Sequence, residues 1–72
     1  MAELTHAQYD ALERAIIERR RLVVNRRGTE YVVVAKRLRV AGGREAIESE
    51  HPTTGDPITL WLDELDSIEV VR

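Results

Sequence analysis

The hydrophobic residues of this chain follow two different periods, and the change between them falls after the first quarter of the sequence. Leu12 and Ile16 lie on one face of a helix, four positions apart. Thr5 precedes this segment, and Gln8 stands three positions later, a pattern typical of a capping box at a helix start. The pattern predicts a helix over about residues 6–20, with its apolar face against a sheet.

The rest of the chain is predicted to form five short strands. Runs rich in Val, Ile and Leu, several of them alternating with polar residues, are separated by segments dense in turn-forming residues. The pair Gly42-Gly43 is a strong signal for a hairpin turn. The predicted strands cover about residues 21–27, 30–41, 44–51, 57–62 and 67–71.

The second of these strands is unusually long, and its alternation is interrupted. Val32, Val34, Leu38 and Val40 stand at positions of one parity, but Lys36 breaks the series. A bend or bulge near Lys36 would explain the break. Long bent strands of this kind close small barrels.

One helix followed by five short strands joined by tight turns predicts a single domain over residues 1–72. The predicted fold is mostly β with one N-terminal α-helix, arranged as a five-stranded SH3-like or Sm-like bent barrel. The helix would plug one open end of the barrel. The alternative is an open meander with the helix on one face.

The hydrophobic skeleton resembles that of a known family over about five-sixths of the chain. The matching parts are the helix end at residues 12–20, the strand at 22–25, the segment at 33–38 and the closing segment at 60–68. In this spacing the chain resembles the WYL domain, an Sm-like barrel of bacterial transcriptional regulators. The Trp-Tyr-Leu signature itself is absent, and Glu45-Ala46-Ile47 stands near its place. The resemblance implies an Sm-like fold and, as one function, ligand sensing in a regulator.

Charge is divided unevenly along the chain, although the net charge of the 72 residues is only −2. Residues 1–44 carry a formal charge of +5, and residues 45–72 carry −7. Arginine forks onto phosphates and stacks on bases, so the basic half suggests a nucleic-acid site. Its candidate residues are Arg19, Arg20, Arg21, Arg26, Arg27, Lys36, Arg37 and Arg39.

The alternative for these basic residues is pairing within the fold. The third strand should lie beside the second, which places Glu45, Glu48 and Glu50 across from Arg37 and Arg39. Cross-strand pairs of opposite charge are ordinary in sheets, and a dedicated nucleic-acid binder usually has a net positive charge. Internal pairing is therefore favoured over a nucleic-acid site.

Trp61 alternates with Leu60 and Leu62, so its side chain is expected to face away from the core. The same outward orientation is expected for Tyr31, Val33 and Val71, which together would form a second apolar face. We therefore take Trp61, Tyr31, Val33 and Val71 as candidate interface residues. Packing under the helix or contact with another copy is favoured for Trp61 over stacking on a base.

Other features of the sequence favour a protein that is not an enzyme. His51 lies in a loop whose Pro and Gly explain it as a turn, and Asp63-Glu64-Leu65-Asp66 lacks the spacing of a calcium loop. The chain has no cysteine and no apolar run long enough for a membrane span. We expect a cytoplasmic, non-enzymatic module without cofactor or metal, which self-associates or binds a protein partner. RNA or DNA binding, or WYL-like ligand sensing, is the alternative.

Overall fold

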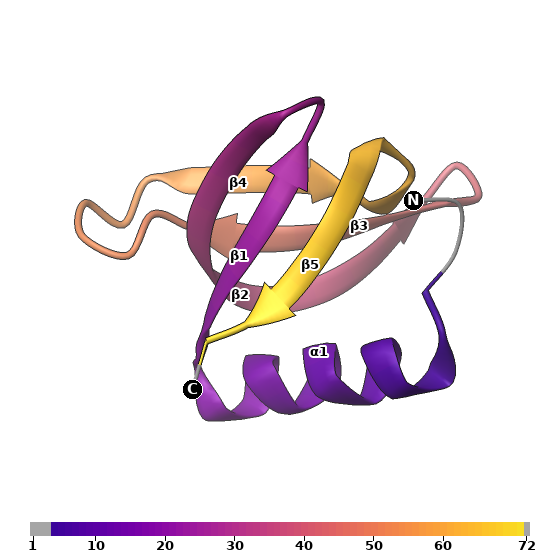
Figure 1. Ribbon diagram of the computed structural model, residues 1–72, viewed down its shortest axis with the longest axis horizontal. Helices are drawn as coiled ribbons and strands as arrows, with labels where there is room; N and C mark the ends of the chain where they lie inside the picture. The colour runs from indigo at the N-terminus through magenta and orange to yellow at the C-terminus, as the bar shows by residue number, and fades with distance from the viewer. Residues whose placement is uncertain (1–3, 72) are drawn as a thin grey trace.

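In the computed structural model, which describes residues 4–71, one helix precedes five strands (Figure 1). The elements are α1 (His6–Glu18), β1 (Arg21–Arg26), β2 (Thr29–Ala41), β3 (Arg44–Glu50), β4 (Pro57–Trp61), the 3-10 turn η1 (Leu62–Glu64) and β5 (Leu65–Val70). The predicted class, mostly β with one N-terminal helix, is confirmed. The bounds of the helix and strands differ from the predicted ones by at most two residues.

The helix begins where the sequence predicted and ends earlier. The Thr5 hydroxyl accepts a hydrogen bond from the Gln8 N–H at 3.2 Å, and the Thr5 N–H donates to the Gln8 side chain at 2.8 Å, which completes the capping box. At the other end, Arg19 adopts a left-handed conformation with φ of 54°, and its N–H donates to the carbonyls of Ala15 and Ile16. This left-handed cap turns the chain into β1, so the helix stops at Glu18.

Two tight hairpins build the centre of the sheet. Arg27 and Gly28 connect β1 to β2 with φ of 50° and 79°, and Gly42 and Gly43 connect β2 to β3 with φ of 58° and 78°. Two successive residues with positive φ are the requirement of a type I′ turn, whose twist matches that of the strands it joins. All strand pairs are antiparallel, and the order across the sheet is β4-β3-β2-β1-β5.

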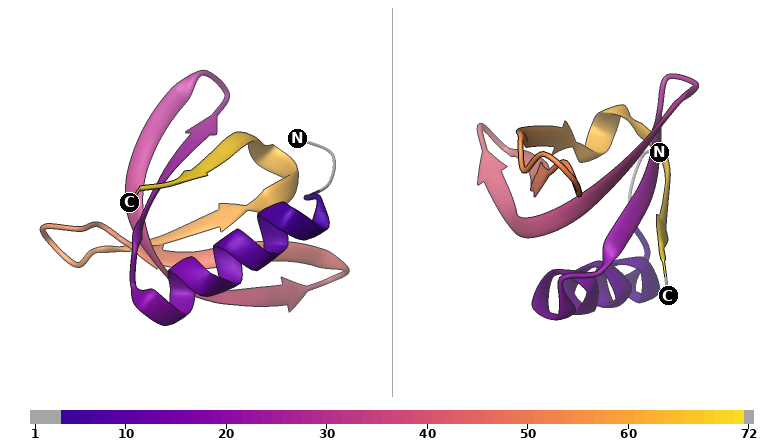
Figure 2. Two further views of the ribbon diagram at one scale, coloured as in Figure 1. Left: turned by 60° about the horizontal axis from the view of Figure 1, so that its bottom comes forward. Right: turned by 90° about the vertical axis from the view of Figure 1, so that its left-hand side faces the viewer.

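The sheet is strongly bent but not closed. β4 and β5 lie at its opposite edges, yet only the three residues of η1 separate them along the chain. Because a chain advances at most about 3.5 Å per residue, the two edges must come near each other at this end. Figure 2 shows the resulting curl of the sheet. Among the described residues β4 pairs only with β3 and β5 only with β1, so the closed barrel expected from the sequence is not formed.

A bulge divides β2 into two parts with opposite orientations. Ala35 pairs with Ser49 and Arg37 with Glu48, so Lys36 is an extra residue, as the interrupted alternation predicted. One extra residue moves every later side chain to the other face of the sheet.

The flip at the bulge corrects the expected orientation of two candidate interface residues. Val33 is fully buried, and Tyr31 packs against the core cluster. Val32 and Val34 point outward, while Leu38, beyond the bulge, packs against the core. Val32, Val34, Leu38 and Val40 therefore do not share one face although they have one parity, because the bulge at Lys36 lies between them.

The core lies between the bent sheet and α1, which runs across the open side of the curl (Figures 1 and 2). Its fully buried large side chains are Leu12, Leu22, Val24, Val33, Ile47, Leu60 and Leu65. The Tyr9 hydroxyl donates a hydrogen bond to the Glu45 carboxylate and so ties α1 to β3. No helix within residues 4–71 is both long enough and apolar enough to cross a membrane.

Candidate interaction surface

The outer face of the sheet, which points away from α1, has two halves that meet at the β2 bulge. We call the first the ionic half; it lies on β3, β4 and the part of β2 after the bulge, and includes Arg37, Arg39, Arg44, Ala46, Glu48, Thr59 and Trp61. We call the second the valine half; it lies on β1, the start of β2, the end of β5 and the residue that follows β5, and includes Arg21, Val23, Val32, Val34, Glu69 and Val71.

Glu48 is the centre of the ionic half. It accepts a hydrogen bond from Arg37, its direct partner across the two strands, and Arg39 lies 3.2 Å from its other carboxylate oxygen. Lys36, at the bulge, forms a longer ion pair with Glu50 at 3.7 Å. The bond from Arg37 holds the pKa of the Glu48 carboxyl below its usual value and raises the pKa of Arg37. Pairing with the acidic half of the chain is therefore confirmed for these basic residues.

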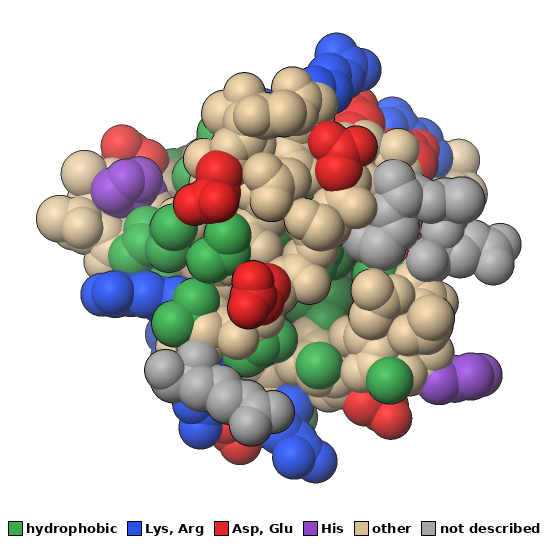
Figure 3. Space-filling view, viewed as in Figure 1, with side chains coloured by type: hydrophobic (Ala, Val, Ile, Leu, Met, Phe, Trp, Pro, Cys, Tyr) green, Lys and Arg blue, Asp and Glu red, His purple; other side chains and the backbone are tan. Residues whose placement is uncertain are grey.

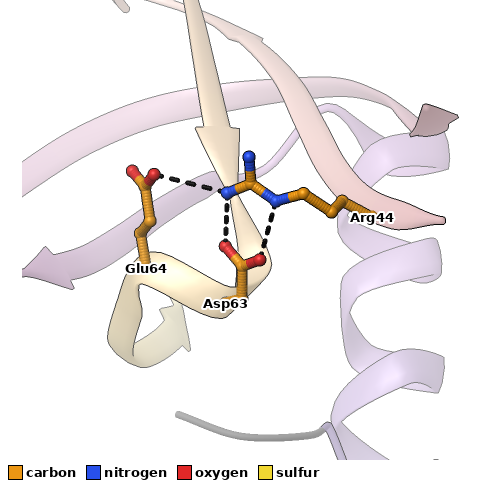
Figure 4. Close-up of polar contacts among 3 residues, drawn as sticks. All are labelled: Arg44, Asp63 and Glu64. Atoms are coloured by element: carbon orange, nitrogen blue, oxygen red, sulfur yellow. Dashed lines mark hydrogen bonds and ion pairs between the residues drawn. The ribbon is translucent and has the colours of Figure 1, made fainter. Parts of the chain in front are cut away.

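Arg44 connects the β2–β3 hairpin to the turn η1. Its guanidinium donates two hydrogen bonds of 2.7 Å to the two carboxylate oxygens of Asp63 and a third, of 3.4 Å, to Glu64 (Figure 4). A forked arginine on a carboxylate is among the stronger and more directional ion pairs. The bonds from Arg44 lower the pKa of the Asp63 carboxyl, and those carboxylates raise the pKa of Arg44. The acidic turn thus serves as the partner of one arginine.

Trp61 faces outward from the sheet, as its alternation predicted. The guanidinium of Arg44 lies 4.4 Å from the centre of its ring system and that of Arg39 lies 6.0 Å away, both within cation–π range. Ala46 pairs with Trp61 and is fully buried, although it is not part of the core cluster. Trp61 therefore helps cover Ala46 on the outer face. Packing of Trp61 under α1 is wrong, because the helix lies on the other face; contact with another copy stays a prediction.

The eight predicted nucleic-acid residues do not form one site. Lys36, Arg37 and Arg39 are paired with glutamates as described above. Arg26 and Arg27 lie at the turn that ends β1, and the remaining three lie at its start: Arg19, Arg20 and Arg21. A six-residue strand separates the two groups by roughly 17–20 Å.

At the hairpin end, Arg26 is held by an aromatic ring. Its guanidinium lies 4.9 Å from the centre of the Tyr31 ring and donates to the Tyr31 hydroxyl at 3.0 Å. At the other end, Arg20 forms an ion pair of 2.5 Å with Glu18. The candidate set therefore divides into three groups: Arg26 and Arg27 at one end of β1, Arg19, Arg20 and Arg21 at the other, and Lys36, Arg37 and Arg39 beside the glutamates of β3.

The valine half was missed by the sequence analysis. Val32 and Val71 are 41% and 40% exposed, and Val23 and Val34 are half-buried beside them. Val23 pairs with Val32, and Val34 pairs with Arg21, whose carbonyl accepts from the Val71 N–H at 2.9 Å. Figure 3 shows hydrophobic side chains gathered around β1 on this side of the molecule, next to an acidic one. The second apolar face therefore contains Val71, as predicted, but not Tyr31 or Val33.

The loop around His51 is an ordered turn. The His51 Nδ1 accepts hydrogen bonds from the N–H groups of Thr53 and Thr54 at 3.2 and 3.3 Å, and the Gly55 N–H donates to the His51 carbonyl. The side chain thus caps its own loop, which agrees with the turn interpretation. Within residues 4–71, no three His, Asp or Glu side chains are grouped as a metal site requires.

No protein-family model matches the chain, and comparisons with curated proteins and with solved structures find no match either.

Proposed function

We propose that this protein is a small, non-enzymatic interaction module with an Sm-like fold, and that it associates with copies of itself. The observation that carries the proposal is the open sheet. β4 lies at one edge, and no described strand other than β3 pairs with it. An edge strand presents backbone N–H and C=O groups that can pair with a strand of another molecule.

The composition of β4 supports this use of the edge. Its five residues, Pro57 to Trp61, include no charged side chain. Proteins usually protect a sheet edge with charges, proline or a bulge, because an unprotected edge adds a further strand. Here the one proline stands at the first position of the strand. The opposite edge strand, by comparison, carries Asp66 and Glu69.

The two edges differ, and this difference suits head-to-tail association. A contact between unlike surfaces of identical chains generates a closed ring or an open chain, depending on the rotation between neighbours. The Sm-like part of the proposal is supported by the order of elements, one helix before five strongly bent strands, and by the resemblance of the hydrophobic skeleton.

Light scattering after size exclusion at micromolar concentration tests the proposal. We expect a mass of at least two copies of the 8.2 kDa chain. Thr59→Lys places a charge in the middle of β4 and should lower the mass, whereas Thr53→Lys, in the β3–β4 loop, should leave it unchanged. A parent protein that elutes as an 8.2 kDa monomer would contradict the proposal.

Nucleic-acid binding is the second candidate function, and the β1–β2 hairpin favours it. Arg26 and Arg27 combine two cations with the ring of Tyr31 at an exposed turn, a combination that single-stranded nucleic acids contact by charge and stacking. Binding to mixed oligonucleotides should then weaken steeply with salt, and Arg27→Glu should reduce it. No binding in 50 mM salt would exclude this candidate. WYL-like ligand sensing has only the resemblance in its support.

A further inference from the structure

The valine half differs from the rest of the outer face in having charged residues without partners. Arg21 lies between Val71 and Val34, and Glu69 lies directly across from Val23 on β5. Within the described chain neither Arg21 nor Glu69 takes part in an ion pair. On the ionic half, in contrast, Arg37, Arg39 and Arg44 each have a carboxylate within 3.4 Å.

Arg21 and Glu69 are diagonal neighbours on β1 and β5, and the valines of the patch lie beside them. A patch that carries a cation and an anion without ion pairs in the described chain is able to pair with its own copy. In a contact with twofold symmetry, the same patch occurs on both sides, and each residue of one copy meets a different residue of the other. A patch with charges of one sign would repel its own copy, whereas this one offers Arg21 to Glu69 twice. The half-exposed valines beside these charges supply the apolar area that such a contact buries.

We propose that the valine half is the contact surface of a twofold dimer of this chain. The valines of two copies pack against each other, and Arg21 of each copy pairs with Glu69 of the other. The inference rests on the proposed function in that both partners are copies of this chain. It concerns a separate surface, because the edge of β4 belongs to the opposite end of the sheet.

Charge reversal tests the dimer. Arg21→Glu alone and Glu69→Arg alone each put like charges face to face twice, so each variant should dissociate at a protein concentration at least about tenfold higher than the parent. An equimolar mixture of the two variants restores both attractive pairs, and so does the double variant. Both should recover the parent's association, measured by sedimentation velocity over a dilution series.

Matched controls separate this effect from a general change in charge. Arg27→Glu and Glu13→Arg make the same changes at exposed positions outside the valine half, in a turn and on α1, and should leave the association unchanged. Circular dichroism of each variant checks that the fold is retained. Val32→Lys, which places a charge among the valines, should abolish the contact without recovery in any mixture.

The outcomes distinguish this inference from the proposed function. A monomeric parent protein overturns both. Association that falls with Thr59→Lys but does not respond to Arg21→Glu or Glu69→Arg overturns the twofold dimer and leaves the edge contact. Reversal variants that dissociate but are not restored by mixing also overturn the dimer, because the pairing of Arg21 with Glu69 then does not occur.

Discussion

The two halves of the outer sheet face are built from neighbouring strands, yet they differ in how their exposed side chains are paired and covered. On the ionic half, Glu48 and Asp63 hold Arg37, Arg39 and Arg44, and two of these arginines lie against Trp61. On the valine half, apolar side chains are left exposed, and its cation and anion are unpaired within the described chain. The charges of the ionic half are paired within one molecule. The valine half has exposed apolar side chains and charges that a partner molecule could pair.

The residue that separates the halves is Lys36. Its insertion bends β2 and reverses the orientation of the side chains that follow. Without the bulge, the arginines after it would share a face with Val33 and would point into the core, where unpaired charges are costly. The same bulge therefore builds the ionic half and defines the limit of the valine half.

The comparison depends first on which valines of β2 are buried. Val33→Ala should lower the free energy of unfolding by about 2 kcal/mol, because it leaves a cavity in the core. Val32→Ala, one residue earlier and 41% exposed, should cost less than about 0.5 kcal/mol. Urea denaturation at several protein concentrations separates folding from association. A larger cost for Val32→Ala than for Val33→Ala would reverse the assignment of the two faces.

Removing the aromatic ring tests whether the ionic half stabilises the single molecule. Trp61→Ala should lower the free energy of unfolding by about 1–3 kcal/mol, since it uncovers Ala46 and removes the surface on which Arg44 lies. Val71→Ala on the valine half is the matched change and should cost less than about 0.5 kcal/mol. If Trp61→Ala were as stable as the parent, Trp61 would be no part of the packing that we describe.

Acid should weaken the ionic half in particular. Arg37 lowers the folded-state pKa of Glu48, and Arg44 lowers that of Asp63. At low pH the unfolded chain therefore binds protons at these groups more readily than the folded one. Their stabilising contribution is complete above about pH 5 and is lost as the pH falls through the folded pKa values. Thermal melts from pH 6 to pH 3 should show this loss, and Glu48→Gln should make it smaller.

The matched variant for the acid experiment is Glu13→Gln, which changes an exposed acid of α1 that has no ion pair in the described chain. Its melts should show the same loss of stability in acid as the parent's. An acid dependence that Glu13→Gln reduces as much as Glu48→Gln would show that the ion pairs of the ionic half are not its source.

The smallest expected effect comes from Ser49, which lies on the inner face of β3, behind the ionic half. Ser49 is 3% exposed, and its hydroxyl is buried without a hydrogen-bond partner among residues 4–71. Ser49→Ala removes a polar group that is desolvated in the folded state, so it should raise the free energy of unfolding by up to about 1 kcal/mol. Denaturant titration measures this. A loss of more than about 1 kcal/mol would mean that the hydroxyl makes a stabilising contact.

The elements of this fold could be predicted because their signals are local. Thr5 and Gln8 mark the helix start through bonds within one turn, and Gly42 and Gly43 supply the positive φ of a hairpin without the strain of a side chain. The interrupted alternation around Lys36 indicated the bulge. The hairpin turn at Gly42 and Gly43 also indicated that the second and third strands lie side by side.

The candidate site could be predicted only in part, because it depends on which residues meet across strands. The pairing of Arg37 and Arg39 with Glu48 was expected from strand adjacency. The valine half was not expected. Val32, Val33 and Val34 are consecutive and place valines on both faces of β2, so the sequence does not show which face points toward α1. The fork of Arg44 on Asp63 joins a hairpin to a distant turn, and no spacing in the sequence indicated it.

By itself, the sequence determined one helix, five strands, their tight turns and the position of the bulge, because each is set by the conformational preferences of a few consecutive residues. Only the tertiary structure decided that the sheet stays open, that Val33 is inside while Val32 is outside, and that the basic residues divide into separate groups. These features depend on how the sheet bends and on where the helix covers it, and therefore on contacts between residues that are far apart in the chain.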